Sequence, residues 1–544
     1  MRHSRYIGST LLAVLIAFTS FAHPNRVSAS SASSQLPFDD IAANYATEAI
    51  LHLSQLNIVS GTGQRKFEPR KAITRAEFVA MLGRLLSLSP VSSAIAGFED
   101  VPKTVWYYGW VQAGIQLSFV QGASSTRFAP AQEVTRQEAA ALLARALNQT
   151  EASSSDGTDI YTKPFADRQQ ISSWAVPFVS RLVQIELMKG DERGNFRPQS
   201  AITRQEAAVL LDRVLQREQW ADQIKLQPED SVQLGWQYGQ TTKQFEQQVA
   251  TSAVNTLSPR WFFLGKSGGL DDYTDPSLLT WAHQRGKKVW AMLGNRSDMA
   301  NTHLMLSASS TRTEFIATLS DAVKRYGIDG MNIDFENVDP QDRETLTLFI
   351  KELSEALRKL KAVLSVNVSP DLGTDWTEAF DYSALGQNAD YLVLMGYDEH
   401  WGGAPEAGSV SSLPWLESGL RKLLSRVPAS KTILALPFYT RDWVTNAYGV
   451  HSSDWSLIDQ NSLLQANRLK PVWNEKLGQY TAEYRQNGVQ HSLWVEDGRS
   501  MTRKIKLGEA HSIAGYGYWY MGGESVDMWT SVRNAMRFAD YRFQ

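Results

Sequence analysis

The sequence predicts a multidomain protein, with an N-terminal all-α, three-repeat helical bundle followed by a C-terminal (β/α)8 barrel. One pattern of residues occurs three times before residue 217. After residue 230, eight apolar segments of strand length alternate with amphipathic helical segments. The chain has 544 residues, of which 43% are hydrophobic, so it can fill more than one core.

Residues 1–29 have the composition of a secretory signal. Two arginines occur among the first five residues, the segment Leu11–Phe18 is apolar, and small residues precede a cleavage site after Ala29. Cleavage after Ala22 is the alternative. The apolar segment is too short to span a bilayer, and no later segment is long enough. We therefore expect a secreted protein without a membrane span.

Overall composition excludes several classes of partner and chemistry. The net charge is −3, which argues against binding to nucleic acid or to an anionic membrane. The chain contains no cysteine, so neither disulfides nor thiolate chemistry is available. The nine histidines lack metal-binding spacings, and we expect no metal and no cofactor.

Each repeat has the same order of signals. A Phe-x-Asp motif opens the repeat, a helical segment ends at a glycine, and a Phe-x-Pro turn leads to a Thr-Arg-x-Glu motif. The threonine and glutamate predict a helix N-terminal capping box. The arginine is not explained by capping, because a cation at a helix N-terminus opposes the helix dipole. Its recurrence indicates carboxylate binding, although a solvated side chain is the simpler alternative; the three residues are Arg75, Arg136 and Arg204.

These repeats resemble S-layer homology domains, with predicted limits of 36–88, 96–149 and 163–216. The resemblance implies a helical bundle that binds secondary cell-wall polysaccharide through its pyruvylated sugars. It also implies that Arg75, Arg136 and Arg204 bind the anionic group. Nearby aromatic residues either stack on sugar or pack in the core; they are Tyr45, Trp106, Trp110 and Trp174.

Residues 217–230 are predicted to be a linker, and residues 231–544 are long enough for a barrel with short insertions. Helices are expected at Thr313–Tyr326 and Arg343–Leu360. The expected strands are Val232–Tyr238, Arg260–Leu264, Lys288–Leu293, Gly330–Glu336, Val363–Val368, Tyr391–Tyr397, Thr432–Pro437 and Ile513–Tyr520.

The strand at 330–336 carries the strongest chemical signal. Because side chains alternate along a strand, Asn332, Asp334 and Glu336 share one face, and the apolar residues between them share the other. Burying two carboxyl groups together is costly unless they are hydrogen-bonded or used in chemistry. A pair of inward carboxyl groups at the end of a barrel strand indicates glycoside hydrolysis by a carboxylic acid with a raised pKa.

The segment Asp329–Glu336 resembles the D-x-x-D-x-D-x-E signature of glycoside hydrolase family 18, with Asn332 in place of the second aspartate. Met395, Tyr397 and Asp398 match the family's M-x-Y-D segment, and Trp519 matches the tryptophan that ends its last strand. The details are most similar to the spore-cortex, peptidoglycan-active N-acetylglucosaminidases. The resemblance implies catalytic roles for Glu336, Asp334 and Tyr397, and substrate-binding roles for Asp329, Asn332, Met395, Asp398 and Trp519.

The resemblance further implies a retaining, substrate-assisted reaction in which the 2-acetamido group of the sugar is the nucleophile. The expected function is a wall-associated hydrolase of β-linked N-acetylglucosamine glycans. The alternatives are a chitinase or endo-N-acetylglucosaminidase that acts on another glycan, a non-catalytic glycan-binding protein, and a structural envelope protein. The third strand ends Leu293-Gly294-Asn295, without the S-x-G-G of many chitinases, so chitin specificity is not transferred.

Overall fold

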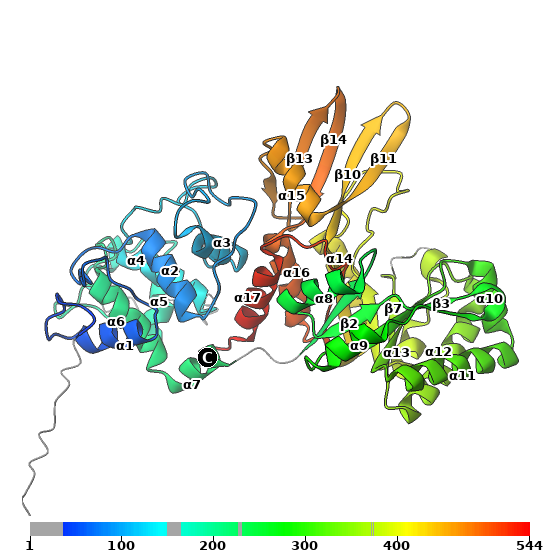
Figure 1. The fold of residues 1–544 in the computed structure, drawn as a ribbon. Helices are drawn as coiled ribbons and strands as arrows, with labels where there is room; N and C mark the ends of the chain where they lie inside the picture. The colour runs from blue at the N-terminus through cyan, green and yellow to red at the C-terminus, as the bar shows by residue number, and fades with distance from the viewer. Residues whose placement is uncertain (1–35, 150–164, 227–230, 372, 374, 544) are drawn as a thin grey trace, which may run out of the picture.

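The computed structural model describes residues 36–149, 165–226, 231–371, 373 and 375–543 (Figure 1). The predicted signal at 1–29 lies outside the described residues. Figure 1 shows the helices of the repeats on one side of the molecule, the barrel on the other, and an antiparallel sheet beside the barrel. No helix among the described residues combines the length and the apolar character needed to cross a membrane.

Each repeat contributes two helices, and all three predicted capping boxes are present at the second helix of each pair. The helices share one hydrophobic core, in which Phe67, Phe128 and Phe196 of the three Phe-x-Pro turns are fully buried. The helices are α1 (Thr47–Gln55), α2 (Arg75–Leu85), α3 (Tyr108–Gln116), α4 (Arg136–Ala146), α5 (Val176–Gln184) and α6 (Arg204–Leu215), with a 3-10 turn η1 (Arg168–Gln170).

The predicted linker at 217–230 contains a helix that the sequence analysis missed, α7 (Glu218–Lys225). Trp220 and Ile224 on this helix are buried in the core of the repeats. Their spacing of four residues places both side chains on one face of the helix. Because this pattern covers only two apolar positions, it was too short to predict a helix from the sequence.

Eight parallel strands close into a ring, which confirms the barrel. Each strand pairs with the next in the order β1, β2, β5, β6, β7, β8, β9 and β15, and β15 pairs with β1. The ring strands are β1 (Val232–Gln237), β2 (Thr256–Pro259), β5 (Lys288–Gly294), β6 (Gly330–Asp334), β7 (Val363–Val368), β8 (Tyr391–Met395), β9 (Thr432–Pro437) and β15 (Gly515–Trp519).

The prediction for the second barrel strand was wrong. That strand is β2 at 256–259, whereas the predicted segment 260–264 contains β3 (Phe262–Leu264), which pairs with β4 (Leu270–Asp272) beyond the end of β2. Trp261 and Phe262 gave the stronger apolar signal, and β2 has only four residues and ends at a proline. Arg260 therefore lies directly after a barrel strand, at its carboxyl end.

Helices surround the barrel, and the predicted helices at 313–326 and 343–360 correspond to α11 and α12. The barrel-side helices are α8 (Thr242–Thr251), α9 (Pro276–His283), α10 (Met299–Ser307), α11 (Ser309–Tyr326), α12 (Arg343–Lys359), α13 (Tyr382–Asn388), α14 (Leu413–Leu424), α16 (Gly498–Ala510) and α17 (Met528–Asp540), with 3-10 turns η2 (Lys266–Gly268), η3 (Pro340–Asp342), η4 (Asp375–Thr377) and η5 (Ala429–Lys431).

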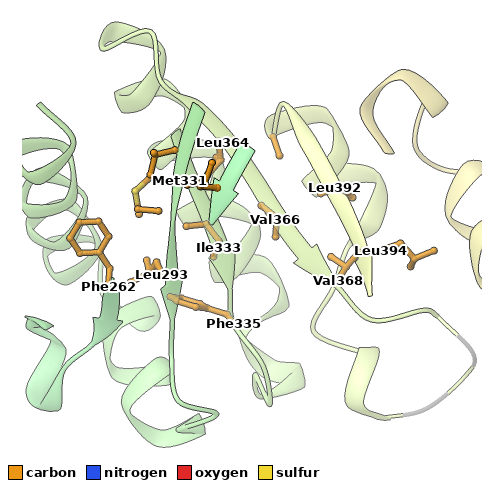
Figure 2. Close-up of a cluster of buried hydrophobic side chains, with 14 of the residues drawn as sticks. Phe262, Leu293, Met331, Ile333, Phe335, Leu364, Val366, Val368, Leu392 and Leu394 are labelled. Carbon is orange, nitrogen blue, oxygen red and sulfur yellow. The ribbon is translucent and has the colours of Figure 1, made fainter. Parts of the chain in front are cut away.

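The main barrel core lies between strands and helices. Met331, Ile333 and Phe335 of the segment 329–336 are buried in it, as the alternation predicted, and Figure 2 shows them beside residues of the neighbouring strands. Phe335 stacks on Phe349 of α12 at a ring distance of 5.7 Å. A smaller cluster that includes Leu234 and Trp236 fills the inside of the ring. This packing fixes which face of β6 points inward.

The expectation of short insertions was also wrong. A five-stranded antiparallel sheet, in the order β11-β10-β14-β13-β12, occupies the chain between β9 and α16. Its elements are β10 (Tyr439–Asn446), β11 (Gly449–Ser456), α15 (Leu457–Ala466), β12 (Val472–Asn474), β13 (Gln479–Gln486) and β14 (Val489–Val495). Many polar residues within these strands reduced their apolar signal.

The C-terminal residues return to the repeats. Phe538, Tyr541 and Phe543 belong to the same hydrophobic core as the repeat helices. The Tyr541 hydroxyl donates to the Leu86 carbonyl oxygen at 2.6 Å, and α3 packs against α16 and α17. The repeats and the barrel therefore share a packed interface in addition to the chain that connects them.

Candidate active site

The two predicted catalytic carboxyl groups lie at the carboxyl end of β6. Asp334 is the last residue of the strand, and Glu336 follows two residues later. Both side chains are partly exposed. Asn332, which lies two residues before Asp334 on the same face of the strand, is fully buried inside the barrel. Chemistry in parallel barrels takes place at this end of the strands.

A chain of hydrogen bonds crosses the barrel interior and ends at Asp334. The Trp236 indole N–H donates to Asn332 Oδ1 at 2.9 Å. Asn332 Nδ2 in turn donates to Asn367 Oδ1 at 2.8 Å and to Ser365 Oγ at 2.9 Å. Asn367 Nδ2 then donates to Asp334 Oδ1 at 2.9 Å. Both amides are thereby oriented, and Asn332 presents no carboxyl group that could exchange a proton with Asp334.

Glu336 is fixed through its backbone. Its N–H donates to Asn295 Oδ1 at 3.0 Å, and Asn295 Nδ2 donates to its carbonyl oxygen at 2.8 Å. Asn295 is buried after β5 and also donates to Thr302 Oγ1. The Ser297 hydroxyl donates to Glu336 Oε2 at 3.2 Å. These contacts fix the backbone of Glu336 and hold its carboxyl group at the carboxyl end of β6.

The protonation states suit acid catalysis. Burial and the charge of nearby Asp334 raise the pKa of Glu336 to about 7. Burial also raises the pKa of Asp334, although the hydrogen bond from Asn367 and the charge of Arg260 oppose this effect. A glutamate with a pKa near neutrality can donate a proton and later accept one.

Aromatic residues form the adjoining wall of the site. Tyr397 stacks on Trp519 at a ring distance of 6.4 Å, and burial raises the Tyr397 pKa well above its ordinary value, so this hydroxyl stays protonated. Asp398 accepts a hydrogen bond from the Tyr439 hydroxyl at 2.5 Å. Met395 ends β8 and is buried, and the peptide bond after Trp519 is cis. The structure therefore places Tyr397, Asp398 and Trp519 together at the carboxyl ends of β8 and β15.

No group of three or more potential metal-binding residues occurs in the part of the chain that the structure describes.

The family description "Glycosyl hydrolases family 18" matches residues 262–524, and "S-layer homology domain" matches residues 37–79, 97–140 and 164–208. The chain is 30% identical over 298 residues to the "uncharacterized glycosylase YvbX" of Bacillus subtilis, covering 52% of this chain and 85% of that protein. The chain belongs to glycosyl hydrolase family 18. It is a glycoside hydrolase, and it carries three S-layer homology domains.

Other comparisons agree with this family. The "cortical fragment-lytic enzyme" of Bacillus cereus is 26% identical over 288 residues, which cover 50% of this chain and 67% of that protein. A chitinase structure from Chromobacterium violaceum, 24% identical, matches with a TM-score of 0.52 and covers 56% of this chain and 98% of its own. At this identity the structural match demonstrates the fold only.

Asp329, the first residue of the family 18 signature, lies away from the other predicted site residues. It precedes β6, at the amino end of the strand, where it accepts hydrogen bonds from His283 Nε2 at 2.8 Å and from the Val289 N–H at 2.9 Å. Lys288 Nζ is 3.4 Å from its second oxygen. These contacts fit a structural role at the start of the strand, and we omit Asp329 from the substrate-binding set.

In the S-layer homology domains, the three predicted arginines connect one repeat to another. Arg75 and Arg204 are buried, and the Nε of each of the three arginines donates to the phenylalanine carbonyl oxygen of another repeat's Phe-x-Pro turn. Each guanidinium also lies near the capping-box glutamate of that repeat. The Nε distances are 2.9 Å from Arg75 to Phe128, 2.8 Å from Arg136 to Phe196, and 2.8 Å from Arg204 to Phe67.

A cavity of about 180 Å³ adjoins one of these arginines, Arg136. Its lining combines Tyr45 of the first repeat with three cationic residues of the third, Lys189, Arg197 and Arg213. Asp191 and Glu206 also line it, and Arg197 lies 3.3 Å from Asp191. Four cationic side chains therefore line this cavity, with Arg136 among them.

The aromatic residues predicted to stack on sugar have two environments. Tyr45, Trp106 and Trp174 are exposed. Trp110 instead packs against the core of the repeats, with Arg84 over its ring. Of these four residues, Tyr45 lines the cavity beside Arg136.

Three residues of the site were not predicted from the sequence: Asn295, Asn367 and Trp236. Asn295 ends the segment that lacks the S-x-G-G motif, and Asn367 occupies an inward position of β7. A buried amide in a barrel strand requires a hydrogen-bond partner, and this signal alone could have identified Asn367.

Proposed function

We propose that this protein hydrolyses the β-linked N-acetylglucosamine glycan of peptidoglycan by a retaining, substrate-assisted reaction. The observation that carries the proposal is Glu336, a carboxyl group with a pKa raised to about 7, beside Asp334 and the protonated Tyr397 at one end of the barrel. The relative named for lysis of cortical fragments and the wall-binding class of the repeats support peptidoglycan as the substrate.

In the proposed reaction, Glu336 donates its proton to the glycosidic oxygen as that bond breaks. The acetamido oxygen of the same sugar attacks C1 and forms an oxazolinium ion. Asp334 accepts a hydrogen bond from the acetamido N–H and stabilises the positive charge, and Tyr397 donates to the acetamido oxygen. Glu336, now ionised, takes a proton from the water that attacks C1 and opens the ring, so the configuration is retained.

The roles of the neighbouring residues follow from their positions. Trp519 provides an apolar surface beneath the sugar, and Asp398, held by Tyr439, supports Tyr397. Asn332 acts indirectly, through Asn367, on the orientation of Asp334. Met395 contributes packing at the end of β8.

The reaction is tested by the stereochemistry and substrate requirement of hydrolysis. Proton NMR of fresh product is expected to show the β-anomer first. A glycan whose cleaved residue carries a free amine in place of the acetamido group is expected not to react, because it lacks the nucleophile. Initial formation of the α-anomer, or equal hydrolysis of the de-N-acetylated glycan, would contradict substrate assistance.

We propose further that residues 36–216 form a three-repeat helical bundle that attaches the secreted enzyme to the cell wall, with export directed by residues 1–29. The ligand is the carboxylate of a pyruvylated wall polysaccharide. The cationic cavity beside Arg136 supports a site between repeats. Arg75 and Arg204 contact neighbouring repeats and are buried, so in our proposal they serve the pocket mainly by holding the repeats together.

Co-sedimentation with purified cell wall tests this attachment. Replacing Lys189 and Arg197 with alanine is expected to reduce the bound fraction without unfolding the repeats, since both residues line the cavity and are exposed. Arg193→Ala is the control, because this exposed arginine lies in the same loop but does not line the cavity. Unchanged sedimentation of the double variant would refute the assignment of this cavity.

A further inference from the structure

Arg260 is a cation of the catalytic cleft that the proposed reaction does not use. It follows β2 and lines a cleft of about 450 Å³ together with Gln240, Trp261, Phe263 and Tyr273. The side chain is partly exposed. Its charge reaches the catalytic centre, since it lowers the pKa of both Asp334 and Glu336. Tyr238 connects this cleft to the site, because its ring lies 5.4 Å from that of Trp519 and also lies beneath the Arg260 guanidinium.

The guanidinium of Arg260 is held by aromatic rings. Its central carbon lies 5.1 Å from the ring centre of Tyr238 and 5.3 Å from that of Phe263. Within the described parts of the chain, its buried Nε has no hydrogen-bond partner, and no carboxylate lies within ion-pair distance. Stacking on rings orients a guanidinium but leaves its hydrogen-bond donors unsatisfied.

Neighbouring cations of the site are neutralised. Arg296, which also lies over Phe263, pairs with Asp271 at 2.7 Å. Arg441 pairs with Asp454 at 2.7 Å. Asp275, the carboxylate that lines the same cleft as Arg260, accepts hydrogen bonds from Thr242 and Ser277. These pairings leave Arg260 as a cation available to a ligand.

A second polar atom in the same cleft also lacks a partner. The buried Oε1 of Gln240 accepts no hydrogen bond within the described residues, while its Nε2 donates to the Met521 carbonyl oxygen. The cleft thus combines an unsatisfied donor group with an unsatisfied acceptor. A sugar that carries a carboxylate beside hydroxyl or amide N–H groups supplies both complements.

We infer that Arg260 binds a carboxylate carried by the glycan and thereby selects an anionic glycan over neutral chitin. The inference rests on the proposed function, because it names the feature by which this site distinguishes peptidoglycan. Two sources can supply the carboxylate: the lactyl group of muramic acid, when no peptide is attached, or the peptide stem linked to that group. A planar guanidinium suits either one, since it can donate two parallel hydrogen bonds.

Calorimetric binding to the full-length protein tests this inference. The Glu336→Gln variant prevents turnover, and it is compared with the double variants that add Arg260→Gln or Arg296→Gln. The ligands are chitotetraose, a peptide-free GlcNAc–MurNAc tetrasaccharide, its methyl ester, and the same tetrasaccharide with peptide stems. We expect Arg260→Gln to weaken binding of the free carboxylate by about tenfold. The affinities for chitotetraose and for the ester are expected to change by less than about twofold.

The ligand series also identifies the source of the carboxylate. If Arg260→Gln weakens binding of the peptide-free sugar only, the lactyl group is the carboxylate that Arg260 binds. If it weakens binding of the peptide-bearing sugar only, that carboxylate belongs to the peptide stem. Arg296→Gln, which removes a cation already paired with Asp271, is expected to leave the preference unchanged. The inference would be overturned if Arg260→Gln changed the affinity for all four ligands equally, or if neither carboxylate-bearing sugar bound to the protein.

The outcome is separable from that of the proposed function. If Arg260→Gln removes a preference for carboxylates while the wild-type protein leaves peptidoglycan intact, the proposed substrate is wrong and the carboxylate site stands. If peptidoglycan is hydrolysed but Arg260→Gln changes all ligands equally, Arg260 acts only through the charge it exerts on Asp334 and Glu336.

Discussion

Replacing Asn367 with alanine removes the hydrogen bond that orients Asp334. The bond joins Asn367 Nδ2 to Asp334 Oδ1 at 2.9 Å, and Asn332 fixes its direction by donating to the other atom of the same amide. A hydrogen bond to a charged group contributes about 1.5–3 kcal/mol. If this contribution is realised in the transition state, kcat/KM falls by about 10- to 150-fold.

The assay follows reducing ends released from a soluble N-acetylglucosamine glycan across a range of pH. Because the hydrogen bond lowers the pKa of Asp334, its loss raises that pKa further, and the acidic limb of the profile moves to higher pH. Ser365→Ala is the matched control, since Ser365 Oγ accepts from the same Asn332 amide but does not contact Asp334. This variant is expected to lose stability and keep its pH profile.

Asn367→Asp separates orientation from charge. The variant keeps the shape of the side chain but places a second carboxyl group 2.9 Å from Asp334, so the two groups share a proton and the pH optimum shifts. If Asn367→Ala keeps kcat/KM within twofold of wild type and leaves the acidic limb unmoved, Asn367 does not position Asp334.

Three further predictions concern other groups. Because Glu336 must be protonated and its pKa is about 7, kcat/KM is expected to fall about tenfold per pH unit above that value, and a rate that keeps rising to pH 9 would exclude Glu336 as the acid. Burial and the charge of Asp527 raise the pKa of Asp497 to about 7, so the folded state binds an extra proton and stability is lost as pH rises from about 4 to about 7. Asp497→Asn keeps the helix cap, and thermal unfolding should show it to be more stable than wild type at pH 8 but not at pH 4; the same difference at both pH values would contradict this. Phe543→Ala removes a buried ring 5.3 Å from Trp220 and should destabilise the repeats by about 3–5 kcal/mol in tryptophan-monitored unfolding, and an unchanged transition would show that the C-terminal residues are dispensable.

The sequence predicted the features that depend on local periodicity. The alternation around Asn332, Asp334 and Glu336 identified the inward face of β6 because period-two patterning is set by the strand itself. The capping boxes were predictable for the same reason, since Thr74 and Glu77 lie within one turn of helix.

The features that were missed depend on contacts distant in sequence. Asn367 meets Asp334 only because β6 and β7 are neighbours, and Arg75 meets Phe128 only because the repeats interlock. The wrong prediction of the second barrel strand has a different cause. The apolar residues after Arg260 outweighed the short β2, whose inward Ser258 weakened its apolar signal.

The partly correct interpretation of the arginines illustrates this difference. Their position in the first turn predicted carboxylate contacts, and Arg204 does lie 2.9 Å from a carboxylate, that of Glu77. That carboxylate belongs to another repeat of the same chain. A single sequence can therefore indicate which kind of group a side chain binds, whereas the fold determines which residue or ligand provides that group.

The central claim is that Glu336 is the acid that cleaves the glycan of peptidoglycan. Mass spectrometry of soluble fragments, released from purified peptidoglycan by wild type and by Glu336→Gln in parallel, tests it most directly. We predict new N-acetylglucosamine reducing ends from wild type and a loss of about 10²- to 10⁴-fold or more in the variant. Fragments at equal rates from both proteins, or none from wild type, would contradict the claim.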